Sequence, residues 1–469
     1  MLTVMDYNVI IIGGGVGGTA IGAILASKGF KTLIIEKNDN IGGRCSTYEK
    51  KGFKIDVGAH VFSRTSNGPL GKILNMIEMQ DSLKWVLAQK PGPRWHYQGK
   101  IWKFPAQFKE LIPNSDFTNL IKLLRDVMRI KDTRELDNIS VKSLLSKYTD
   151  NPLVHTFINI ITMLYLVVPY YHASAGEFVR CFTSLSIDRS IGYPIGGCIS
   201  IPHTYTNGIK KFGGDVKYGL SAENIIIKNE RIEGVELENG EVVKSKIVIS
   251  NAGIKETINN LIGRSSFDKK YLDYVDNLKY AYSAFTLKLA LKRPVTSLKI
   301  LTSFYLKNPE EKVNSLLGGN VPEEVDLFIP IPSNFDPSLT PKGNQLLIAG
   351  TAVPCKNFEK NKKKWVQNSM KCLENIFPGL SENLLWYDVS SPDDIGRLAG
   401  KESSVIGISQ TTNQSGLNRP NVALPIEGLY MVGGDAGGWG IETELAAKSA
   451  IECSKLIYNK IKKPLNSSS

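Results

Sequence analysis

Short apolar runs alternate with polar stretches along the chain, and the first of these runs predict a β–α–β unit. Asn8 to Ile12 is β-branched throughout its apolar part, as expected for a fully buried parallel strand. The small and apolar residues from Ala20 to Ala26 predict a helix, and Thr32 to Ile35 predicts a second strand. Two parallel strands joined by a crossover helix indicate an α/β fold.

Glycine occupies five of the six positions between Gly13 and Gly18, where the first strand passes into the helix. Such a run is costly in backbone entropy, so it indicates that a ligand approaches the backbone closely. The spacing is that of a GxGxxG fingerprint, and the helix N-terminus offers N–H groups and a positive dipole end to phosphates. We therefore predict that a dinucleotide binds along Gly13, Gly14, Gly15, Val16, Gly17 and Gly18.

The residues after the second strand extend this site. Glu36 lies 21 positions after Gly15, where a carboxylate accepts hydrogen bonds from an adenosine ribose, and Lys37 is beside it. A second glycine pair with an arginine follows at Gly42 to Arg44, and then the segment GFKIDVGAH ends at His60. A nicotinamide domain needs neither of these additions, whereas the longer FAD does, so they favour FAD as the cofactor.

The pattern GGGVGG…E…GGR followed by D-x-G-x-H resembles the N-terminal signature of the FAD-dependent amine oxidase and phytoene desaturase superfamily. Residues 428–457 (GLYMVGGDAGGWGIETELAAKSAIECSKLI) resemble the second flavin segment of that superfamily. The middle of the chain is similar too, with YPIGG from Tyr193 and SNA from Ser250. YPxGG, D-x-G-x-H and SNA favour the polyene-desaturase branch, which includes carotenoid desaturases, saturases and isomerases.

The resemblance implies roles for single residues. Gly43 and Arg44 would lie along the FAD diphosphate and ribityl chain, where a guanidinium fork suits phosphate. Ala222 would offer a backbone contact to the adenine, and Asn251 of the SNA segment would also touch FAD. Asp435 would bond the ribityl or pyrophosphate end, although such an aspartate also suits a structural turn.

The flavin ring has its own implied neighbours. Gly58, Ala59 and His60 would pass beside the isoalloxazine, and a helix beginning near Ile441 would point its N-terminus at the ring. His60 is the sole histidine of a flavin motif and the one candidate for a catalytic residue, shaping the site or assisting proton transfer. The alternative is a histidine with a purely structural role.

The same patterns predict a discontinuous α/β architecture. A Rossmann-like FAD-binding domain of the glutathione-reductase-like type is expected from residues 1–67, 192–262 and 423–463. The intervening residues 68–191 and 263–422 would form an inserted α+β substrate domain, and residues 464–469 a disordered tail. A second strand–GxGxxG–helix unit is missing from the sequence, which argues against a built-in NAD domain.

Composition and charge limit the partners. The content of 42% hydrophobic and 22% charged residues is typical of a soluble globular protein. The net charge of +12 comes from scattered lysines without a basic, aromatic-rich helix, which argues against nucleic acid and leaves a solvated surface or an anionic membrane surface. The six cysteines show no CxxC pair or metal-ligand spacing, so we expect reduced thiols, no metal site and a cytoplasmic protein.

The apolar segment from Val154 to Tyr171 is the main clue to the substrate. Its longest uninterrupted part, Phe157 to Pro169, has 13 residues and is shorter than the ~20 that a membrane-spanning helix needs. It is expected to be a buried helix between domains, or the wall of a hydrophobic tunnel, or a face that dips into a membrane.

These features predict an FAD-dependent oxidoreductase that acts on a hydrophobic, unsaturated, isoprenoid- or carotenoid-like chain by hydride transfer at flavin N5. Desaturation, saturation and isomerisation all remain open. A flavin amine oxidase is the first alternative, although the C-terminal flavin segment offers only Trp439 for an aromatic cage and no evident lysine. The second alternative is a non-catalytic prenyl carrier resembling Rab GDP-dissociation inhibitors, against which the intact glycine fingerprint argues.

Overall fold

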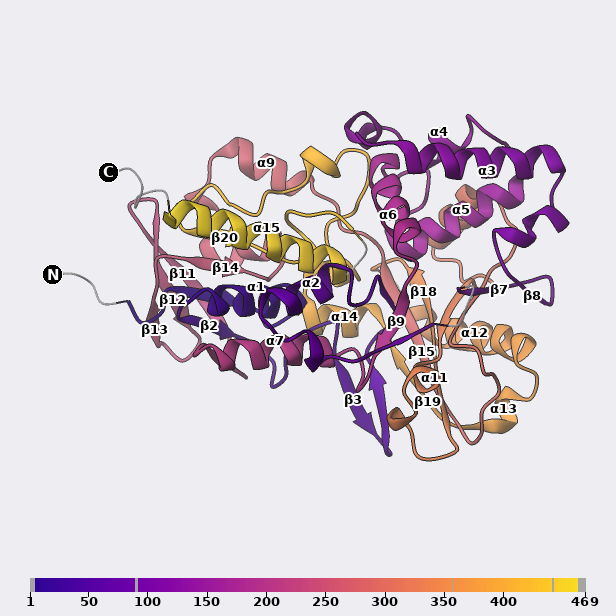
Figure 1. Ribbon diagram of the computed structural model, residues 1–469, viewed down its shortest axis with the longest axis horizontal. Helices are drawn as coiled ribbons and strands as arrows, with labels where there is room; N and C mark the ends of the chain where they lie inside the picture. The colour runs from indigo at the N-terminus through magenta and orange to yellow at the C-terminus, as the bar shows by residue number, and fades with distance from the viewer. Residues whose placement is uncertain (1–4, 89–91, 357, 441–442, 463–469) are drawn as a thin grey trace.

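The computed structural model describes residues 5–88, 92–356, 358–440 and 443–462. The molecule is elongated, with one large sheet in each half (Figure 1). The helix start predicted at Ile441 and the tail predicted for residues 464–469 lie outside the described residues.

A five-stranded, wholly parallel sheet forms the first half, with the order β10–β2–β1–β14–β20. This arrangement confirms the predicted Rossmann-like α/β fold. The strands come from three separated parts of the chain: β1 (Val9–Ile12), β2 (Thr32–Ile35), β10 (Asp215–Lys217), β14 (Val248–Ser250) and β20 (Leu429–Met431).

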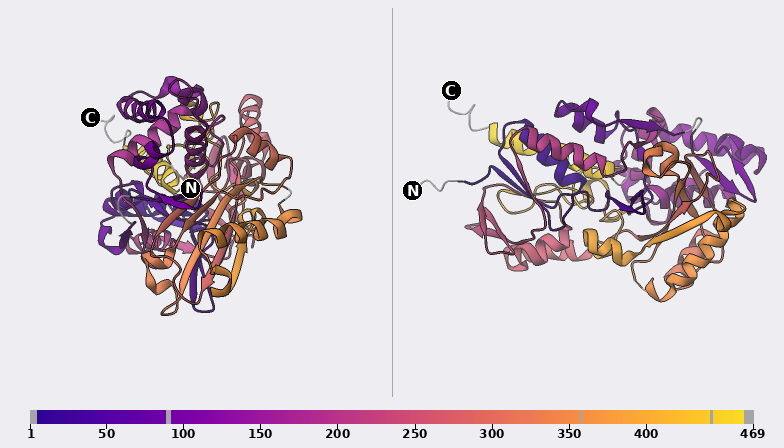
Figure 2. Two further views of the ribbon diagram at one scale, coloured as in Figure 1. Left: turned by 90° about the vertical axis from the view of Figure 1, so that its right-hand side faces the viewer. Right: turned by 90° about the horizontal axis from the view of Figure 1, so that it is seen from below.

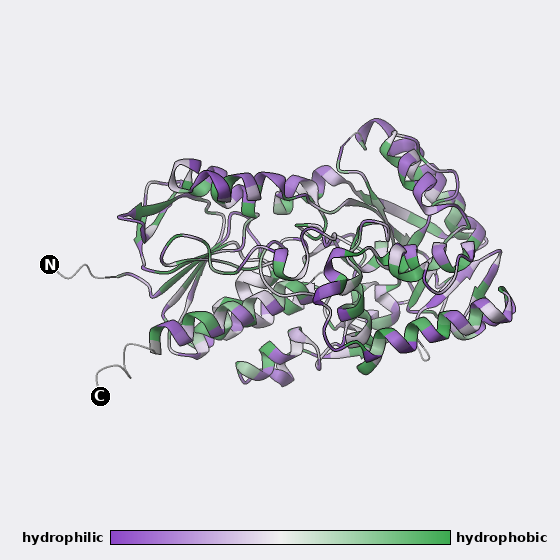
Figure 3. Ribbon diagram, turned by 90° about the horizontal axis from the view of Figure 1, so that it is seen from above, coloured by the Kyte–Doolittle hydropathy of each residue, from purple (hydrophilic) through white to green (hydrophobic). Residues whose placement is uncertain are grey.

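Alternate residues of the central strand enter two different cores. Val9 and Ile11 of β1 pack on one face of the sheet, whereas Ile10 and Ile12 pack on the other. This division follows from the two-residue period of a strand, and it explains why the whole run is apolar. Figure 3 shows the strands of this half mainly in the colour of hydrophobic residues.

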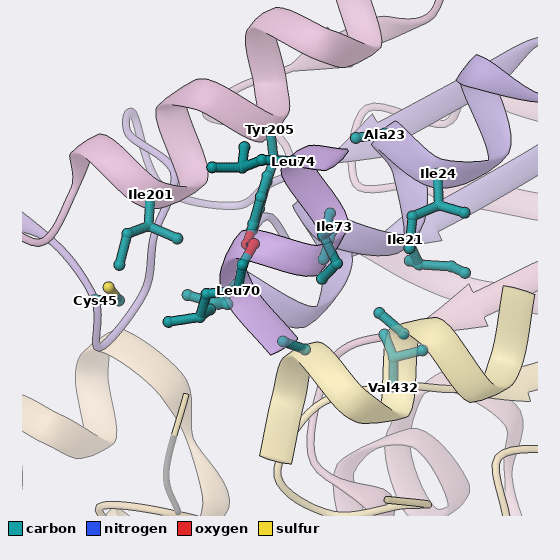
Figure 4. Packing of buried hydrophobic residues seen from close by; sticks show 14 of the residues in the cluster. Ile21, Ala23, Ile24, Cys45, Leu70, Ile73, Leu74, Ile201, Tyr205 and Val432 are labelled. Atoms are coloured by element: carbon teal, nitrogen blue, oxygen red, sulfur yellow. The ribbon is translucent and has the colours of Figure 1, made fainter. Parts of the chain in front are cut away.

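Helices cover the first face of this sheet. Ile21 and Ile24 of α1 pack with Ile73 of α2 and Tyr205 of α7, and the Tyr205 hydroxyl donates a hydrogen bond of 2.8 Å to the Leu70 carbonyl (Figure 4). The helices concerned are α1 (Val16–Ser27), α2 (Pro69–Met76), α7 (Ser200–Lys211) and α15 (Thr443–Lys462). Although α2 falls in the residues predicted for the substrate domain, its apolar face packs against the first half.

A three-stranded antiparallel sheet, β11–β12–β13, adjoins the other face. The turn between β12 and β13 contains Gly240 at φ +80°, a conformation that glycine adopts without strain. Val275 of α9 packs into this same core, so residues 269–277 also lie with the first half and not with the predicted substrate domain. The elements are β11 (Ala222–Lys228), β12 (Arg231–Leu237), β13 (Val242–Lys244), α8 (Ile254–Glu256) and α9 (Lys269–Asn277).

A mixed seven-stranded sheet, β19–β15–β18–β17–β16–β7–β8, dominates the second half. Figures 1 and 2 show helices α3 to α6 on one side of it and α12 on the other. The strands are β7 (Arg94–Tyr97), β8 (Lys100–Trp102), β15 (Ser283–Leu291), β16 (Ile300–Ser303), β17 (Leu327–Pro330), β18 (Gln345–Val353) and β19 (Leu384–Ser390). The helices are α3 (Asn114–Arg129), α4 (Val141–Leu145), α5 (Pro152–Tyr165), α6 (Ala175–Ile187), α10 (Pro309–Leu317), α11 (Pro332–Phe335), α12 (Lys362–Ile376), α13 (Leu380–Asn383) and α14 (Pro392–Ala399).

Short strands connect the two halves. The ribbon of β3 (Thr47–Lys50) and β4 (Phe53–Asp56) leads into residues 57–61, and β5 (Phe62–Ser63) then pairs with β9 (Ile191–Pro194), which also pairs with β6 (Trp85–Leu87). Within the described part of the chain, none of the helices combines the length and the apolar character that crossing a bilayer requires.

Candidate active site

The glycine run forms a cradle that has no room for side chains. A Cβ atom on Gly15 would lie 2.8 Å from Asn251 Nδ2, and one on Gly17 would lie 2.7 Å from Asn251 Oδ1. A Cβ atom on Gly18 would lie 2.0 Å from the Gly13 carbonyl oxygen, because α1 and β1 cross closely there. Helix α1 begins after Gly15 without a side-chain cap, so the N–H groups of its first turn face the cradle with their dipole.

Glu36 at the end of β2 closes one side of this cradle. Its Oε2 atom accepts a hydrogen bond of 2.6 Å from the Gly14 N–H, and its Oε1 atom accepts one of 2.9 Å from the Asn38 N–H. The side chain is buried, yet it lines the same cavity as the glycines. Oε1 also accepts a hydrogen bond of 2.7 Å from Asn38 Nδ2, so Oε2 is the atom that keeps a lone pair for a hydroxyl donor of a ligand.

One cavity of about 430 Å³ runs from the glycine cradle into the region between the two halves. The structure brings most of the residues predicted from the sequence onto its wall: Gly13, Gly15, Val16, Gly17, Glu36, Lys37, Gly43, Arg44, Gly58, Ala59, His60, Ala222 and Asn251. Gly14, Gly18 and Asp435 lie behind the wall and not on it. Gly14 lies in the turn after β1, and Gly18 lies where α1 crosses β1.

Asp435 is wholly buried and is bonded to protein groups. Its carboxylate accepts hydrogen bonds from the N–H groups of Ile254 (2.9 Å) and Ile408 (3.1 Å), and Lys401 Nζ lies 3.3 Å from Oδ1. Lys401 lines the cavity. Burial lowers the pKa of Lys401, and the Asp435 carboxylate opposes that effect. Asp435 therefore acts on the cavity through Lys401 and the surrounding backbone.

Sequence reasoning missed Lys401, because it stands in no recognisable motif and reaches the cavity only through the fold. It also missed Gly433 and Gly434, which line the cavity directly after β20. The signal for these two was present, since they form a glycine pair in the C-terminal segment that resembles the flavin signature. Thr443, the first residue of α15, lines the cavity as well, so this helix begins at the ligand site.

His60 lies where the wall passes from polar to apolar. Its Nδ1 atom is 3.6 Å from Asp56 Oδ2, and Asp56 also accepts hydrogen bonds of 2.6 Å from both Thr47 Oγ1 and Tyr193 Oη. Burial disfavours a charged imidazole, but Cys198 and the Asp56 carboxylate raise the pKa of His60 well above its usual value. Burial alone would raise the pKa of Asp56, yet His60, Thr47 and Tyr193 lower it.

The far end of the cavity is apolar. Met163 and Leu164 of α5 and Val167 just after it face Phe328 of β17 and Ala352 of β18. The predicted apolar segment thus forms a buried helix that is also a cavity wall. Among the described residues of this wall, Phe328 and His60 carry the only aromatic rings.

The cavity fits FAD. The glycine cradle with the uncapped start of α1 suits a pyrophosphate, and Glu36 suits a ribose. Arg44 lines the cavity beyond them and donates from Nη1 to the Ser404 carbonyl (3.0 Å), which fixes the guanidinium in place.

Comparisons with known proteins agree with this description. The family of NAD(P)-binding Rossmann-like domains matches residues 11–76. Prolycopene isomerase of Daucus carota is 25% identical over 91% of this chain and 76% of its own. The zeta-carotene-forming phytoene desaturase of Myxococcus xanthus is 25% identical over 93% of this chain and 92% of its own. The all-trans-retinol 13,14-reductase of Danio rerio is 23% identical over 97% of this chain and 86% of its own.

Solved structures share the fold over nearly the whole chain. An oxidoreductase from Methanosarcina mazei superimposes with a TM-score of 0.78 at 20% identity, covering 95% of this chain and 99% of its own. A putrescine oxidase variant superimposes with a TM-score of 0.72 at 14% identity, covering 98% and 100%. The dinucleotide fingerprint, the cavity and these relatives lead to one conclusion. The chain is similar over most of its length to members of the superfamily of FAD-dependent amine oxidases and phytoene desaturases, and it is an FAD-dependent oxidoreductase.

Proposed function

We propose that this oxidoreductase acts on a long, unsaturated, isoprenoid-like chain, which it desaturates, saturates or isomerises. The observation that carries the proposal is the apolar end of the cavity, walled by α5, β17 and β18, directly beyond the residues that fit the flavin. An apolar chain is held there by burial alone and needs no charged partner. The relatives named for prolycopene, phytoene and retinol act on substrates of this chemical kind.

The FAD contacts follow from the cavity wall. Backbone N–H groups at Gly15, Val16 and Gly17 would hold the pyrophosphate, with Arg44 adding positive charge. Glu36 would accept from the ribose, and Ala222 lies on the wall where an adenine contact is expected. Lys37, Gly43, Asn251, Gly433 and Gly434 would complete the enclosure.

When bound, FAD supplies a two-electron acceptor or donor at its ring. Gly58, Ala59 and His60 would flank that ring, and the N-terminus of α15 at Thr443 would direct its positive dipole end toward the same region. Asp435 would position Lys401 at the wall without touching the cofactor. His60, whose pKa is raised by Cys198 and Asp56, would hold a proton near the ring, and the apolar wall would exclude water from the reacting carbon atoms.

Amine oxidation is less well supported by this wall. An amine substrate needs aromatic faces around its nitrogen, and the described part of the wall contains no tryptophan or tyrosine.

Contact with an anionic membrane is a further part of the proposal, because a chain substrate resides in lipid and the protein carries a net charge of +12. Flotation with anionic but not with neutral vesicles would support it.

The decisive experiment records the flavin absorption spectrum of the purified protein under anaerobic conditions. We expect the oxidised bands to bleach with an isoprenoid polyene, or the reduced form to recover its bands when the polyene is added. Hydrogen peroxide release with simple amines, together with no response to polyenes, would overturn the proposal in favour of amine oxidation.

A further inference from the structure

A second, smaller cavity of about 70 Å³ adjoins the apolar end of the first. The two cavities share part of their lining, so they lie next to one another at this end of the main cavity. The shared residues are Met163, Leu164, Phe328, Gly350, Thr351 and Ala352.

Two buried polar side chains line this second cavity without using their full hydrogen-bonding capacity. Asn159 of α5 is 4% exposed, and its Oδ1 atom accepts a hydrogen bond of 3.1 Å from the Tyr170 N–H. Its Nδ2 group makes no hydrogen bond to any described residue. Thr302 of β16 is 2% exposed, and its hydroxyl likewise has no partner within the described ranges. Because both residues line the cavity, a ligand atom inside it can supply the hydrogen-bond partner that the described residues do not.

An ion pair between Lys312 of α10 and Asp326 also lines the second cavity. The two side chains are only 14% and 16% exposed, and Asp326 additionally accepts from the Tyr305 N–H at 3.1 Å. Because each charge is compensated by the other, the pair adds polarity to the cavity but little net charge. This arrangement suits a neutral oxygen better than a carboxylate.

We infer that the second cavity binds the end group of the substrate chain, and that this end group is a neutral oxygen function, a hydroxyl or a carbonyl. The inference rests on the proposed function, since it names the end of the same chain. A chain ending in a methyl group would displace solvent from Asn159 Nδ2 and the Thr302 hydroxyl without replacing its hydrogen bonds, which costs affinity. An oxygen end group accepts from the amide, and a hydroxyl also donates to Thr302.

The test compares geranylgeraniol with its deoxy analogue, in which the terminal CH₂OH is replaced by CH₃, and with geranylgeranoic acid. Dissociation constants are measured by calorimetry on the FAD-loaded protein, with the ligands delivered from cyclodextrin. We expect the alcohol to bind roughly tenfold more tightly than the hydrocarbon and more tightly than the acid.

Thr302→Val is the informative variant, because it removes a hydroxyl that bonds no described residue and places a β-branched residue in a strand. It should reduce the preference for the alcohol roughly fivefold while leaving the affinity for the hydrocarbon unchanged or improved. Asn159→Asp keeps the oxygen that accepts from the Tyr170 N–H but removes the Nδ2 donor. It should also reduce the preference for the alcohol over the hydrocarbon. Thr162→Val is the matched control, because the Thr162 hydroxyl lies in α5 and donates to the Ile158 carbonyl (2.7 Å) without lining either cavity.

The outcomes separate the two proposals. If none of the three ligands binds the wild-type protein, the proposed function itself fails. If the ligands bind but the alcohol has no advantage, or if Thr302→Val weakens alcohol and hydrocarbon equally, the second cavity is only a passage and the inference fails. If the acid binds best, the assignment of a neutral end group is wrong.

Discussion

The two ends of the main cavity are built from different parts of the polypeptide. At the cradle, the wall is backbone, and Cβ atoms on Gly15 or Gly17 would come within 3 Å of Asn251. At the far end, the wall is formed by the side chains of Met163, Leu164 and Phe328. A backbone site admits almost no substitution, whereas a side-chain site can be reshaped one residue at a time. In the proposed function, the cradle therefore determines which cofactor binds, and substitutions at the far end change which substrate binds.

The largest effect is expected where the cradle is filled. Gly15→Val would place a branched side chain at the pyrophosphate position and against Asn251, so FAD retention should fall more than 100-fold, or ~3 kcal/mol. The ratio of flavin to protein absorbance after purification measures this loss, and circular dichroism checks that the variant is folded. Ser27→Ala, at the other end of α1, is the control. Full FAD occupancy in Gly15→Val would mean that the phosphates lie elsewhere.

A substitution at the far end of the cavity should weaken substrate binding and leave FAD binding unchanged. Leu164→Trp would fill space at the wall that the two cavities share and weaken polyene binding by about 2 kcal/mol, or roughly thirtyfold, without loss of FAD. Calorimetry with a polyene and the flavin absorbance report the two effects separately. Ile187→Trp adds the same ring at a position that is 82% exposed and should change neither. Loss of FAD in Leu164→Trp would contradict the separation of the two ends.

A smaller effect is expected from Glu36→Gln. The amide keeps one oxygen acceptor but loses the charge that binds the Gly14 N–H and, in the proposal, the ribose, so FAD affinity should fall about tenfold. Titration of the FAD-free protein with FAD, followed by flavin fluorescence, measures it. Glu223→Gln removes an exposed carboxylate of β11 as the matched control. An unchanged affinity would remove Glu36 from the cofactor site.

The smallest effect concerns the junction between the two ends, where His60 faces Asp56. The raised pKa of His60 stabilises the fold fully below its unfolded value of about 6.5, and this stability is lost as pH rises through the folded pKa. The lowered pKa of Asp56 stabilises the fold above about pH 4, and this stability is lost as pH falls through the folded pKa. The pair thus contributes most between about pH 4 and 6.5.

His60→Gln should therefore lower the free energy of unfolding by about 1 kcal/mol near pH 5.5 and by less on either side. Urea unfolding of the FAD-free protein across this pH range measures the difference. His203→Gln, on the exposed side of α7, is the comparison variant: burial and Lys210 lower the pKa of His203, so its removal should change stability with pH in the opposite sense. A difference that stays constant with pH would show that His60 only fills space.

The sequence was informative where function depends on local backbone. Gly13 to Gly18 and Glu36 could be placed because a strand, a turn and a helix fix their positions within one short segment. Asp435 was found but assigned to the ligand, since the sequence does not reveal that Ile254, Ile408 and Lys401 already use its carboxylate. No local sequence pattern marks Lys401, Thr302 and Asn159, because long-range packing and strand pairing bring these residues to the cavities.

The strand order of the parallel sheet also sets the timing of cofactor loading. β20 pairs with β14 across about 180 intervening residues, and Gly433 and Gly434, which close the cavity, follow it directly. During synthesis, the glycine cradle leaves the ribosome long before these residues exist. A nascent chain therefore carries an incomplete flavin pocket, and stable uptake of FAD must wait until Gly433 and Gly434 have been translated.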